Sequence, residues 1–549
     1  MKKMLAVAGA AVFAGLATLA QTATNVAPTA LKVVETTPEA AQTGAVAKTV
    51  EATSDWLVSF TNFVEMVDGW VWGVPLIAAI LVTGLLLTCI LRFIHLFNLK
   101  RAFQYMFHQE VDPGVNGEVS QFGALCTALS ATIGTGNIVG VATAYVAGGP
   151  GAIFWMWLAA LFGMATKYSE GLLAVKYREH DEKTGHVLGG PFYYIERGMG
   201  PKWKWLACLF AFFGVLVGLF GIGTFTQVNS ICGSFNTFFK SYIDTADVHN
   251  FTILGNSYSC ATIFGSILLA FMVGMVVIGG LKRIAKVSEK VIPLMVVLYI
   301  AFSLILVFCN LGRIPAALAT IVKSAFGLQA AAGGALGAVI VAMQKGIARG
   351  IFSNEAGLGS APIAAAAAQT KEPVRQGLVS MTGTFLDTIV VCSMTGLALT
   401  MTNQPISAES FKGVSELYSA SAASGAAATM KAFAVGIPFL PPIVTDALLM
   451  VSLVLFGFTT ILGWDYYSER CLEYLTNGRM GPVLVYRWFY IAAVFIGPYM
   501  TISAVWGIAD IVNGLMAVPN MIALLALSGV IVAETKSYFR RLKAGEIKE

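Results

Sequence analysis

Long apolar stretches, separated by short polar segments, follow one another from about residue 72 to residue 533. Each stretch holds about 20 or more residues, the length that a helix needs to cross the hydrocarbon core of a bilayer. The pattern therefore predicts an all-α integral membrane protein with eleven transmembrane helices. These predicted spans cover residues 72–95, 122–146, 151–177, 203–232, 258–280, 289–310, 335–356, 376–402, 438–463, 485–505 and 508–533.

The composition excludes most other classes of protein. Of the 549 residues, 57% are hydrophobic and only 12% are charged, and the mean hydropathy is +0.74. A soluble protein has about 25% charged residues, so this chain lacks the polar surface that a soluble enzyme needs. The same composition excludes a disordered or fibrous protein. The net charge of +5 does not indicate nucleic-acid binding, because the basic residues follow the membrane topology.

The Lys and Arg residues divide unequally between the two sides of the predicted membrane protein. If the first span begins outside, the loops and helix ends expected inside carry 23 Lys and Arg residues, whereas the outer loops carry five. Cytoplasmic loops of membrane proteins are enriched in these residues. The count therefore predicts an outer N-terminus, a cytoplasmic tail at 534–549, and a location in a bacterial cytoplasmic (inner) membrane.

The N-terminal region has the pattern of a secretory signal peptide. Residues 1–20 combine Lys2 and Lys3 with a short apolar run that ends in small residues, as in a signal that is removed. An uncleaved anchor helix is the alternative. Residues 21–71 follow as a predicted flexible outer tail. The aromatic residues at its end recur at roughly helical spacing and predict a short interfacial helix.

Two of the predicted spans contain residues that interrupt a helix. The second span includes residues 130–137, Ser-Ala-Thr-Ile-Gly-Thr-Gly-Asn, and the seventh runs into residues 351–362, Ile-Phe-Ser-Asn-Glu-Ala-Gly-Leu-Gly-Ser-Ala-Pro. In a bilayer, non-helical backbone persists only where it lines a polar cavity. The glycines alone would fit close helix packing, but Asn137 at the midplane needs hydrogen-bonding partners that such packing does not supply.

The two interrupted spans lie five spans apart, which predicts two inverted repeats. We therefore predict a first repeat at 122–310, a second at 335–533, and an accessory helix at 72–95. Transporters of this architecture bind substrate and coupling ion at the two breaks. The sequence contains no GxxxxGK[ST] phosphate loop, so we expect no ATP-driven pump. The energy for transport would come from an ion gradient, or transport would be passive.

The first break offers groups suited to an amino acid and a cation. Backbone amides at the start of a half-helix suit a carboxylate, whereas unwound carbonyls and hydroxyls suit Na⁺. We predict that the amides of Thr135 and Gly136 hold the substrate carboxylate. Thr132 and the side-chain oxygen of Asn137 would line a sodium site beside it, so that ion and substrate strengthen each other's binding.

Asp387 lies well inside the eighth span, and an intramembrane carboxylate is a functional candidate by default. We predict that it binds the cation together with Asn137. Two alternatives stay open. One is an ion pair with Lys345 or Arg349, which share a face of the seventh span and otherwise line the inner vestibule. The other is titration of Asp387 in a proton-coupled cycle.

Several motifs resemble the alanine/glycine:cation symporters, the sodium:alanine symporter family. The resemblance covers roughly residues 75–540. The motifs that carry it lie at residues 127–137, 148–163, 227–229, 279–285, 352–362, 383–387 and 464–469. The resemblance implies sodium-coupled uptake of small neutral amino acids, on a leucine-transporter-like fold of two five-helix inverted repeats.

The resemblance also implies further residues of a substrate site. Gln227 would bond the ammonium or the carboxylate of the amino acid. Thr460 and Trp464, four residues apart on one helix face, would lie beside the substrate, with Trp464 capping the pocket. Phe352 would pack on the substrate side chain. An interfacial position for Trp464 and a core position for Phe352 are the alternatives.

Together these patterns predict a secondary active transporter that imports alanine, glycine or a similarly small amino acid with Na⁺ by alternating access. A second sodium site would use carbonyls near Ser130 and Ile133 with the hydroxyl of Thr459 or Thr460. We expect no cofactor besides Na⁺ as the coupling ion, no ATP and no nucleic acid. Since the predicted contacts with the amino acid and the ion are all non-covalent, we expect that the protein is not an enzyme. The alternatives are a proton-coupled symporter and a passive facilitator or channel, although channels usually show rings of identical groups.

Overall fold

The computed structural model describes residues 63–107 (except residue 65), 117–180, 187–242, 250–253, 256–327, 335–403, 425–499 and 502–547. The predicted signal peptide and most of the predicted outer tail lie outside these residues. Within the described residues nearly every element is a helix, and the two sheets are antiparallel pairs of short strands. The chain therefore has the predicted all-α architecture.

The elements of the first half of the chain extend through the first break to the segment before the second repeat. They are α3 (Val74–Ile90), α4 (Ile94–Phe97), α5 (Leu99–Phe107), α6 (Gln121–Thr132), η2 (Thr135–Asn137), α7 (Val139–Gly148), α8 (Gly151–Lys176), β1 (Glu179–His180), β2 (Val187–Leu188), α9 (Pro191–Tyr193), η3 (Tyr194–Gly198), η4 (Pro201–Trp203), α10 (Lys204–Phe220), α11 (Phe225–Tyr242), β3 (Asn250–Ile253), β4 (Asn256–Ser259), α12 (Cys260–Val277), α13 (Leu281–Cys309), η5 (Leu311–Arg313) and α14 (Ile314–Ala325).

The elements of the second half begin with the helix that leads into the second break. They are α15 (Ala335–Asn354), α16 (Ala361–Ala365), α17 (Pro373–Thr384), η6 (Phe385–Cys392), α18 (Ser393–Thr402), α20 (Gly425–Gly436), α21 (Pro442–Leu475), α22 (Met480–Ile496), η8 (Gly497–Tyr499), α23 (Ile502–Ala526) and α24 (Ser528–Lys543).

The described helices account for the hydrophobic stretches of the sequence. Eight are long and apolar enough to cross a membrane, or nine if the pair α6 and η2–α7, bent by 61°, is one span. Two further predicted spans form the long helices α8 and α15. The all-helical membrane architecture is confirmed, and the number of eleven spans stays a prediction.

The fourth predicted span, at 203–232, lies within one candidate span, Pro201–Tyr242, which is interrupted between the helices α10 and α11. The chain leaves the helix at residues 221–224. At this point the backbone approaches α21 so closely that a Cβ on Gly223 would lie 2.7 Å from the Cβ of Trp464. The interruption therefore makes room for α21.

Two later spans differ from the predicted bounds at their ends. The span predicted at 438–463 continues as α21 to Leu475, because the polar residues of its last turns are buried or paired with one another. The span predicted at 508–533 ends at Ala526. The chain then starts the separate amphipathic helix α24, whose buried residues recur every three or four positions.

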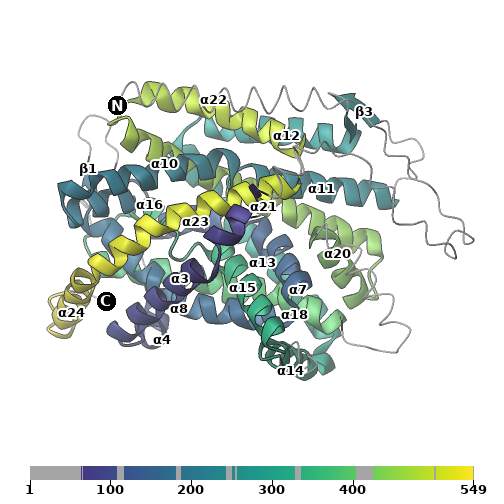
Figure 1. The fold of residues 1–549 in the computed structure, drawn as a ribbon, viewed down its shortest axis with the longest axis horizontal. Helices are drawn as coiled ribbons and strands as arrows, with labels where there is room; N and C mark the ends of the chain where they lie inside the picture. The colour runs from purple at the N-terminus through teal and green to yellow at the C-terminus, as the bar shows by residue number, and fades with distance from the viewer. Residues whose placement is uncertain are drawn as a thin grey trace, which may run out of the picture.

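The two interrupted segments pack against each other in opposite directions. α15, which leads into the second break, packs on α7, which follows the first break, and α16 packs on α6. α8 packs against α15, α17 and α3. α23 runs obliquely across α3 (Figure 1). The breaks are thereby brought face to face inside the bundle, which is the arrangement that inverted repeats produce.

Candidate functional site

The first break lies between α6 and α7, where the chain forms only the short 3₁₀ turn η2. Asn137 holds this turn, because its Oδ1 accepts a hydrogen bond from the Gly134 amide at 2.8 Å. A Cβ on Gly134 would overlap Oγ1 of Thr460 and lie 3.2 Å from Oε1 of Gln227. The glycine therefore lets α21 and α11 approach the broken backbone.

The second break follows α15. Glu355 has a left-handed backbone there, with a φ of 56°, and Gly357 has a φ of 93°. Positive φ is costly for residues other than glycine, so the contacts of Glu355 hold it in place. Its carboxylate accepts a hydrogen bond from Ser360 Oγ at 2.5 Å and from the indole N–H of Trp464 at 2.9 Å.

Asp387 lies between the two breaks. It belongs to η6, a π-helical segment in the middle of the eighth predicted span, and is fully buried. Its carboxylate accepts hydrogen bonds from Asn137 Nδ2 at 2.6 Å, Ser353 Oγ at 3.0 and 3.1 Å, and Thr388 Oγ1 at 2.7 Å. Asn354 in turn donates to Thr388 at 3.0 Å. The fold thus brings Asn137 and Asp387 together, and it adds two hydroxyls that sequence reasoning had not named.

Arg349 does not pair with Asp387. It forms a bidentate ion pair with Asp510 of α23, at 3.0 and 3.2 Å, and its guanidinium lies 5.3 Å from the ring centre of Phe352. No ion pair joins Lys345 to Asp387 among the residues that the structure describes. The ion-pair alternative for Asp387 is therefore wrong, because Arg349 pairs with Asp510 instead.

The ring of Phe352 lies beside the first break. A Cβ on Gly136 would lie 3.4 Å from this ring, and the ring of Trp506 on α23 lies at a centroid distance of 5.3 Å from it. Phe352 is only 2% exposed. It is therefore both a packed core residue and a neighbour of the Gly136 backbone.

Gln227 reaches the first break from α11. Its Oε1 accepts hydrogen bonds from the backbone amide of Thr135 at 3.1 Å and from the Thr135 hydroxyl at 2.9 Å, and its Nε2 donates to the Ile222 carbonyl at 3.0 Å. The Thr135 amide, which the sequence predicts to hold a carboxylate, is thus directed at an oxygen acceptor supplied by Gln227.

Thr460 and Trp464 lie one turn apart on α21 and both contact the breaks. The hydroxyl of Thr460 donates to the Ile133 carbonyl at 3.4 Å. Trp464 is fully buried, and its indole N–H is bound to Glu355. The interfacial alternative for Trp464 is therefore wrong, because a buried carboxylate holds the indole in the interior.

Thr459 faces away from the first break. Its hydroxyl donates to carbonyls of its own helix and lies 3.4 Å from Sδ of Met295 on α13. Of the two threonines considered for a second cation, Thr460 is thus the one that meets Ile133.

Ser130 and Thr132 lie on α6 just before the break. A Cβ on Gly463 of α21 would lie 2.7 Å from Ser130 Oγ, so Ser130 is next to α21. The hydroxyl of Thr132 donates to the Ala128 carbonyl of its own helix at 3.2 Å. It is not hydrogen-bonded to Asn137 within the described residues.

Sequence reasoning missed a second buried polar group, which joins α8 to the second break. Glu170 is fully buried, and its Oε1 accepts hydrogen bonds from the Gly357 amide at 3.1 Å and from Asn520 Nδ2 at 2.7 Å. Lys167 lies one turn earlier on α8 and is 3% exposed. Charged residues inside a predicted span were the signal that could have found both.

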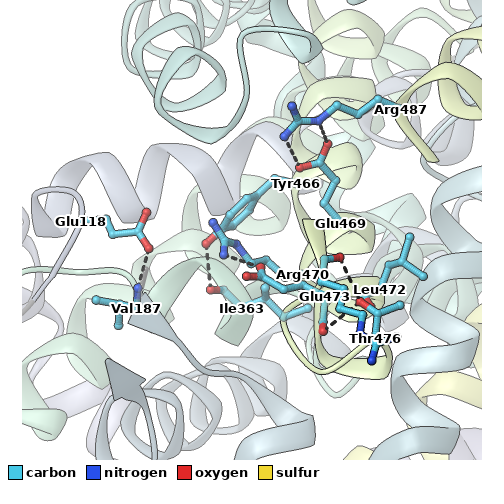
Figure 2. A network of polar contacts seen from close by, with 11 residues as sticks. Glu118, Val187, Ile363, Tyr466, Glu469, Arg470, Leu472, Glu473, Thr476 and Arg487 are labelled. Carbon is cyan, nitrogen blue, oxygen red and sulfur yellow. Dashed lines mark hydrogen bonds and ion pairs between the residues drawn. The ribbon is translucent and has the colours of Figure 1, made fainter. Parts of the chain in front are cut away.

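A polar network lies at the far end of α21 (Figure 2). Glu469 binds the guanidinium of Arg487 on α22 through both carboxylate oxygens, and Arg470 pairs with Glu473 at 2.6 Å. Tyr466 donates to a backbone carbonyl of α16 at 3.3 Å. These contacts attach the last turns of α21 to α22 and to the half-helix after the second break.

Arg178, just after α8, binds the backbone that follows α16. Its guanidinium donates to the carbonyls of Ala366, Ala368 and Thr370 at 2.9, 2.6 and 2.6 Å. Burial lowers the pKa of Arg178 to about 10, so the side chain still carries its charge at neutral pH. A permanent cation therefore satisfies the carbonyl end of this half-helix.

Comparison with known proteins identifies the family. A model described as the sodium:alanine symporter family matches residues 57–549. The chain belongs to this family. An uncharacterized transporter of Haemophilus influenzae is 51% identical over 490 residues, which are 88% of this chain and 98% of the relative. The sodium/alanine symporter AgcS of Methanococcus maripaludis is 43% identical, over 89% of this chain and 100% of that protein.

More distant relatives extend the comparison. The probable sodium/glutamine symporter GlnT of Bacillus subtilis is 35% identical, over 88% of this chain and 92% of that protein. The crystal structure of MhsT in complex with L-phenylalanine matches with a TM-score of 0.50 at 13% identity, over 77% of this chain and 93% of that one. The leucine-transporter-like fold and the family resemblance are confirmed. The protein is a membrane transporter of the amino-acid and cation symport kind, and not an enzyme.

Proposed function

We propose that the protein imports a small neutral amino acid, such as alanine or glycine, together with Na⁺ by alternating access. The observation that carries the proposal is the cluster of Asn137, Ser353 and Asp387, where the two broken helices face each other. Asn137 comes from the first break, Ser353 from the last turn of α15 just before the second, and Asp387 from η6. A bound ion at this point would join the moving parts of both repeats.

The coupling cation binds at Asp387 in this proposal. Carboxylate, hydroxyl and amide oxygens are the ligands that hard cations prefer. The groups that donate to Asp387 from Asn137, Ser353 and Thr388 are all neutral, so they leave its negative charge in place. A carboxylate inside a membrane is costly without a counter-ion, and a cation that neutralises it would bind favourably.

The amino acid binds beside the ion, with its carboxylate on the amides of Thr135 and Gly136. These amides open a half-helix, where the backbone dipole favours negative charge. Gln227 already accepts from the Thr135 amide, so its side-chain oxygen would turn to the substrate ammonium when the carboxylate takes its place. Phe352 and Trp464 then bound the space for the side chain, which favours a small amino acid.

A second sodium site would form at the carbonyl of Ile133. The Thr460 hydroxyl lies 3.4 Å from this oxygen, and Ser130 lies against α21 next to it. An ion here would link α6 to α21. Thr459 is not part of this proposal, because its hydroxyl faces α13.

The relatives support the choice of substrate and ion, since AgcS is named a sodium/alanine symporter and GlnT a probable sodium/glutamine symporter. The excess of basic residues in one set of loops supports a cytoplasmic membrane location with the C-terminus inside. Under this proposal the mature chain begins near Gln21, and N-terminal sequencing of membrane-inserted protein would detect Met1 if the segment is instead an anchor.

Radiolabelled alanine uptake into proteoliposomes tests the function. An inward Na⁺ gradient should drive alanine above its external concentration, while equal K⁺ or proton gradients should not. Accumulation driven by protons instead would establish the proton-coupled alternative. Equilibration without accumulation under every gradient would establish a facilitator and contradict the proposal.

A further inference from the structure

Glu355 is a carboxylate of the second break that the proposed function does not use. The residue is fully buried, and each of its side-chain oxygens accepts one hydrogen bond. Ser360, five residues further along the same break, donates to Oε2 at 2.5 Å, and the indole N–H of Trp464 on α21 donates to Oε1 at 2.9 Å. Glu355 therefore connects the second break to the helix that carries the proposed pocket cap.

The backbone of Glu355 does not by itself explain why a glutamate stands here. The residue has a φ of 56°, a left-handed conformation in which glycine and asparagine are the common residues. Its amide donates to the Ile351 carbonyl at 2.8 Å, and its carbonyl accepts from the Leu358 amide at 3.2 Å. Neither bond involves the side chain. The contacts of the carboxylate are therefore what distinguishes glutamate from a better turn residue at this position.

The indole of Trp464 depends on this carboxylate for its orientation. An indole has one N–H donor and no acceptor, and this N–H is bound to Glu355. The base of the side chain is confined by the backbone near Gly223, where a Cβ would lie 2.7 Å from the Cβ of Trp464, and the ring meets Tyr467 edge-on at a centroid distance of 5.4 Å. Without the carboxylate the ring would turn to seek another acceptor, since a buried N–H without a partner is costly.

The indole and the second break both lie beside the proposed amino-acid site. Trp464 follows Thr460 by one turn of α21, and the Thr460 hydroxyl contacts the first break. Phe352 precedes Glu355 by three residues, and its ring would lie 3.4 Å from a Cβ on Gly136. The segment from Phe352 to Glu355 thus supplies one wall of the site directly and holds the other wall through a hydrogen bond.

We propose that Glu355 is a positioning residue for substrate selectivity, which holds the indole of Trp464 across the pocket and so excludes side chains longer than that of alanine. This inference rests on the function proposed above, in which Trp464 bounds the space for the substrate side chain. Glu355 acts through the indole and not by touching the amino acid or the cation. Its reach and its acceptor oxygen are what matter, and not its charge.

Two substitutions at this position separate reach from charge. Glu355→Asn keeps a residue that tolerates left-handed backbone, but its side chain is one methylene too short for the indole. Glu355→Gln keeps the length and an acceptor oxygen, and its amide N–H can still donate to Ser360. The quantity to measure in proteoliposomes is the inhibition constant of leucine divided by the half-saturating concentration of alanine. This ratio should fall about fivefold or more in Glu355→Asn, the effect of one buried hydrogen bond, and stay within about twofold of wild type in Glu355→Gln.

Trp464→Phe removes the same hydrogen bond from the other side, and it also covers the case in which Glu355→Asn does not fold. It should lower the ratio as well. The double variant should lower the ratio no further than the larger single effect, because both changes remove one shared interaction. Ser360→Ala is the matched control, since it removes the other hydrogen bond of the same carboxylate and should keep the wild-type ratio. A merely structural role would lower the maximal rate and leave the ratio unchanged.

The outcomes distinguish this inference from the function on which it rests. If wild type shows no Na⁺-driven alanine uptake, or if Trp464→Ala has the selectivity of wild type, the proposed function or its pocket is wrong and the inference falls with it. If Trp464→Ala admits leucine but Glu355→Asn and Trp464→Phe keep the wild-type ratio, this inference alone is overturned. An equal fall of the ratio in Glu355→Gln and Glu355→Asn would overturn it as well, because the charge of the carboxylate would then decide the selectivity.

Discussion

The carboxylate of Asp387 receives its hydrogen bonds from three separate parts of the chain, namely Asn137 in the first break, Ser353 before the second, and its own neighbour Thr388. These donors fix the position of the carboxylate without neutralising it. Shape and charge can therefore be tested separately at this residue, because an amide keeps the shape and removes the charge.

Asp387→Asn should raise the Na⁺ concentration for half-maximal uptake by about tenfold or more, because the ion loses a charged ligand in a low-dielectric site. The alanine concentration for half-maximal uptake at saturating Na⁺ should change far less. Initial uptake rates over a range of Na⁺ concentrations measure this. Asp446→Asn is the control, since Asp446 lies near the start of α21 and bonds Tyr242. Unaltered Na⁺ dependence in Asp387→Asn would remove Asp387 from the cation site.

Trp464→Ala should widen the selectivity of the transporter. The indole occupies buried space beside Thr460 and Glu355, so its removal leaves room for a longer substrate side chain. Unlabelled leucine or methionine should inhibit the uptake of labelled alanine more strongly in this variant than in wild type. Trp205→Ala is the control, because Trp205 is 61% exposed on the surface of the bundle. Selectivity identical to wild type would place Trp464 outside the pocket.

At the same scale, the sequence indicated some site residues and concealed others. Asn137 and Asp387 are unusual in apolar stretches, and this contrast alone singled them out. Ser353 and Thr388 give no such contrast, since a hydroxyl in a membrane helix can bond its own backbone. Whether these hydroxyls bond Asp387 depends on the neighbours that they face in the fold, and the sequence alone does not give those neighbours.

At the scale of elements, the π-helical segment η6 decides what faces the first break. Asp387 and Cys392 both contact Nδ2 of Asn137, at 2.6 and 3.3 Å. Residues five apart lie on different faces of an α-helix, but a π-helix pairs position i with i+5. A search for helical periodicity in the sequence would therefore assign the two residues to different surroundings.

Gly134 in the first break provides a test in which a substitution adds a single methyl group. Gly134→Ala should abolish uptake, or reduce it by about a hundredfold, because the added Cβ overlaps the Thr460 hydroxyl and forces α6 and α21 apart. Gly140→Ala, a few residues further along, is the matched control, since a Cβ there meets nothing within 4 Å. Uptake and detergent-solubilised yield should be measured for both. Equal activity of the two variants would show that this contact does not matter.

At the scale of the whole molecule, hydropathy predicted the helical architecture and the two breaks predicted the pairing of the repeats. The predictions failed where tertiary contacts override apolar composition. The end of α21 is polar, yet it continues as a buried helix because Glu469 and Arg470 have partners of opposite charge. Hydropathy measures each residue alone, so it placed the end of this span too early.

This ion-paired end of α21 should matter for stability. Arg487→Met leaves the carboxylate of Glu469 buried without its partner, which costs about 3–5 kcal/mol. The melting temperature of the detergent-solubilised protein should fall clearly. Arg479→Met, at an exposed position between the same two helices, should melt like wild type. If both variants melt alike, the Glu469–Arg487 pair contributes little to stability.

The length of α21 has a mechanical consequence. Its 34 residues form one continuous rod of about 51 Å, well beyond the roughly 30 Å of the hydrocarbon core. Thr460 touches the first break, and Leu475 lies about 22 Å further along at 1.5 Å per residue. A tilt of about 10° around Thr460 would therefore sweep the far end through about 4 Å. A rigid α21 would thus transmit a rotation at the Thr460 contact to the opposite end of the helix.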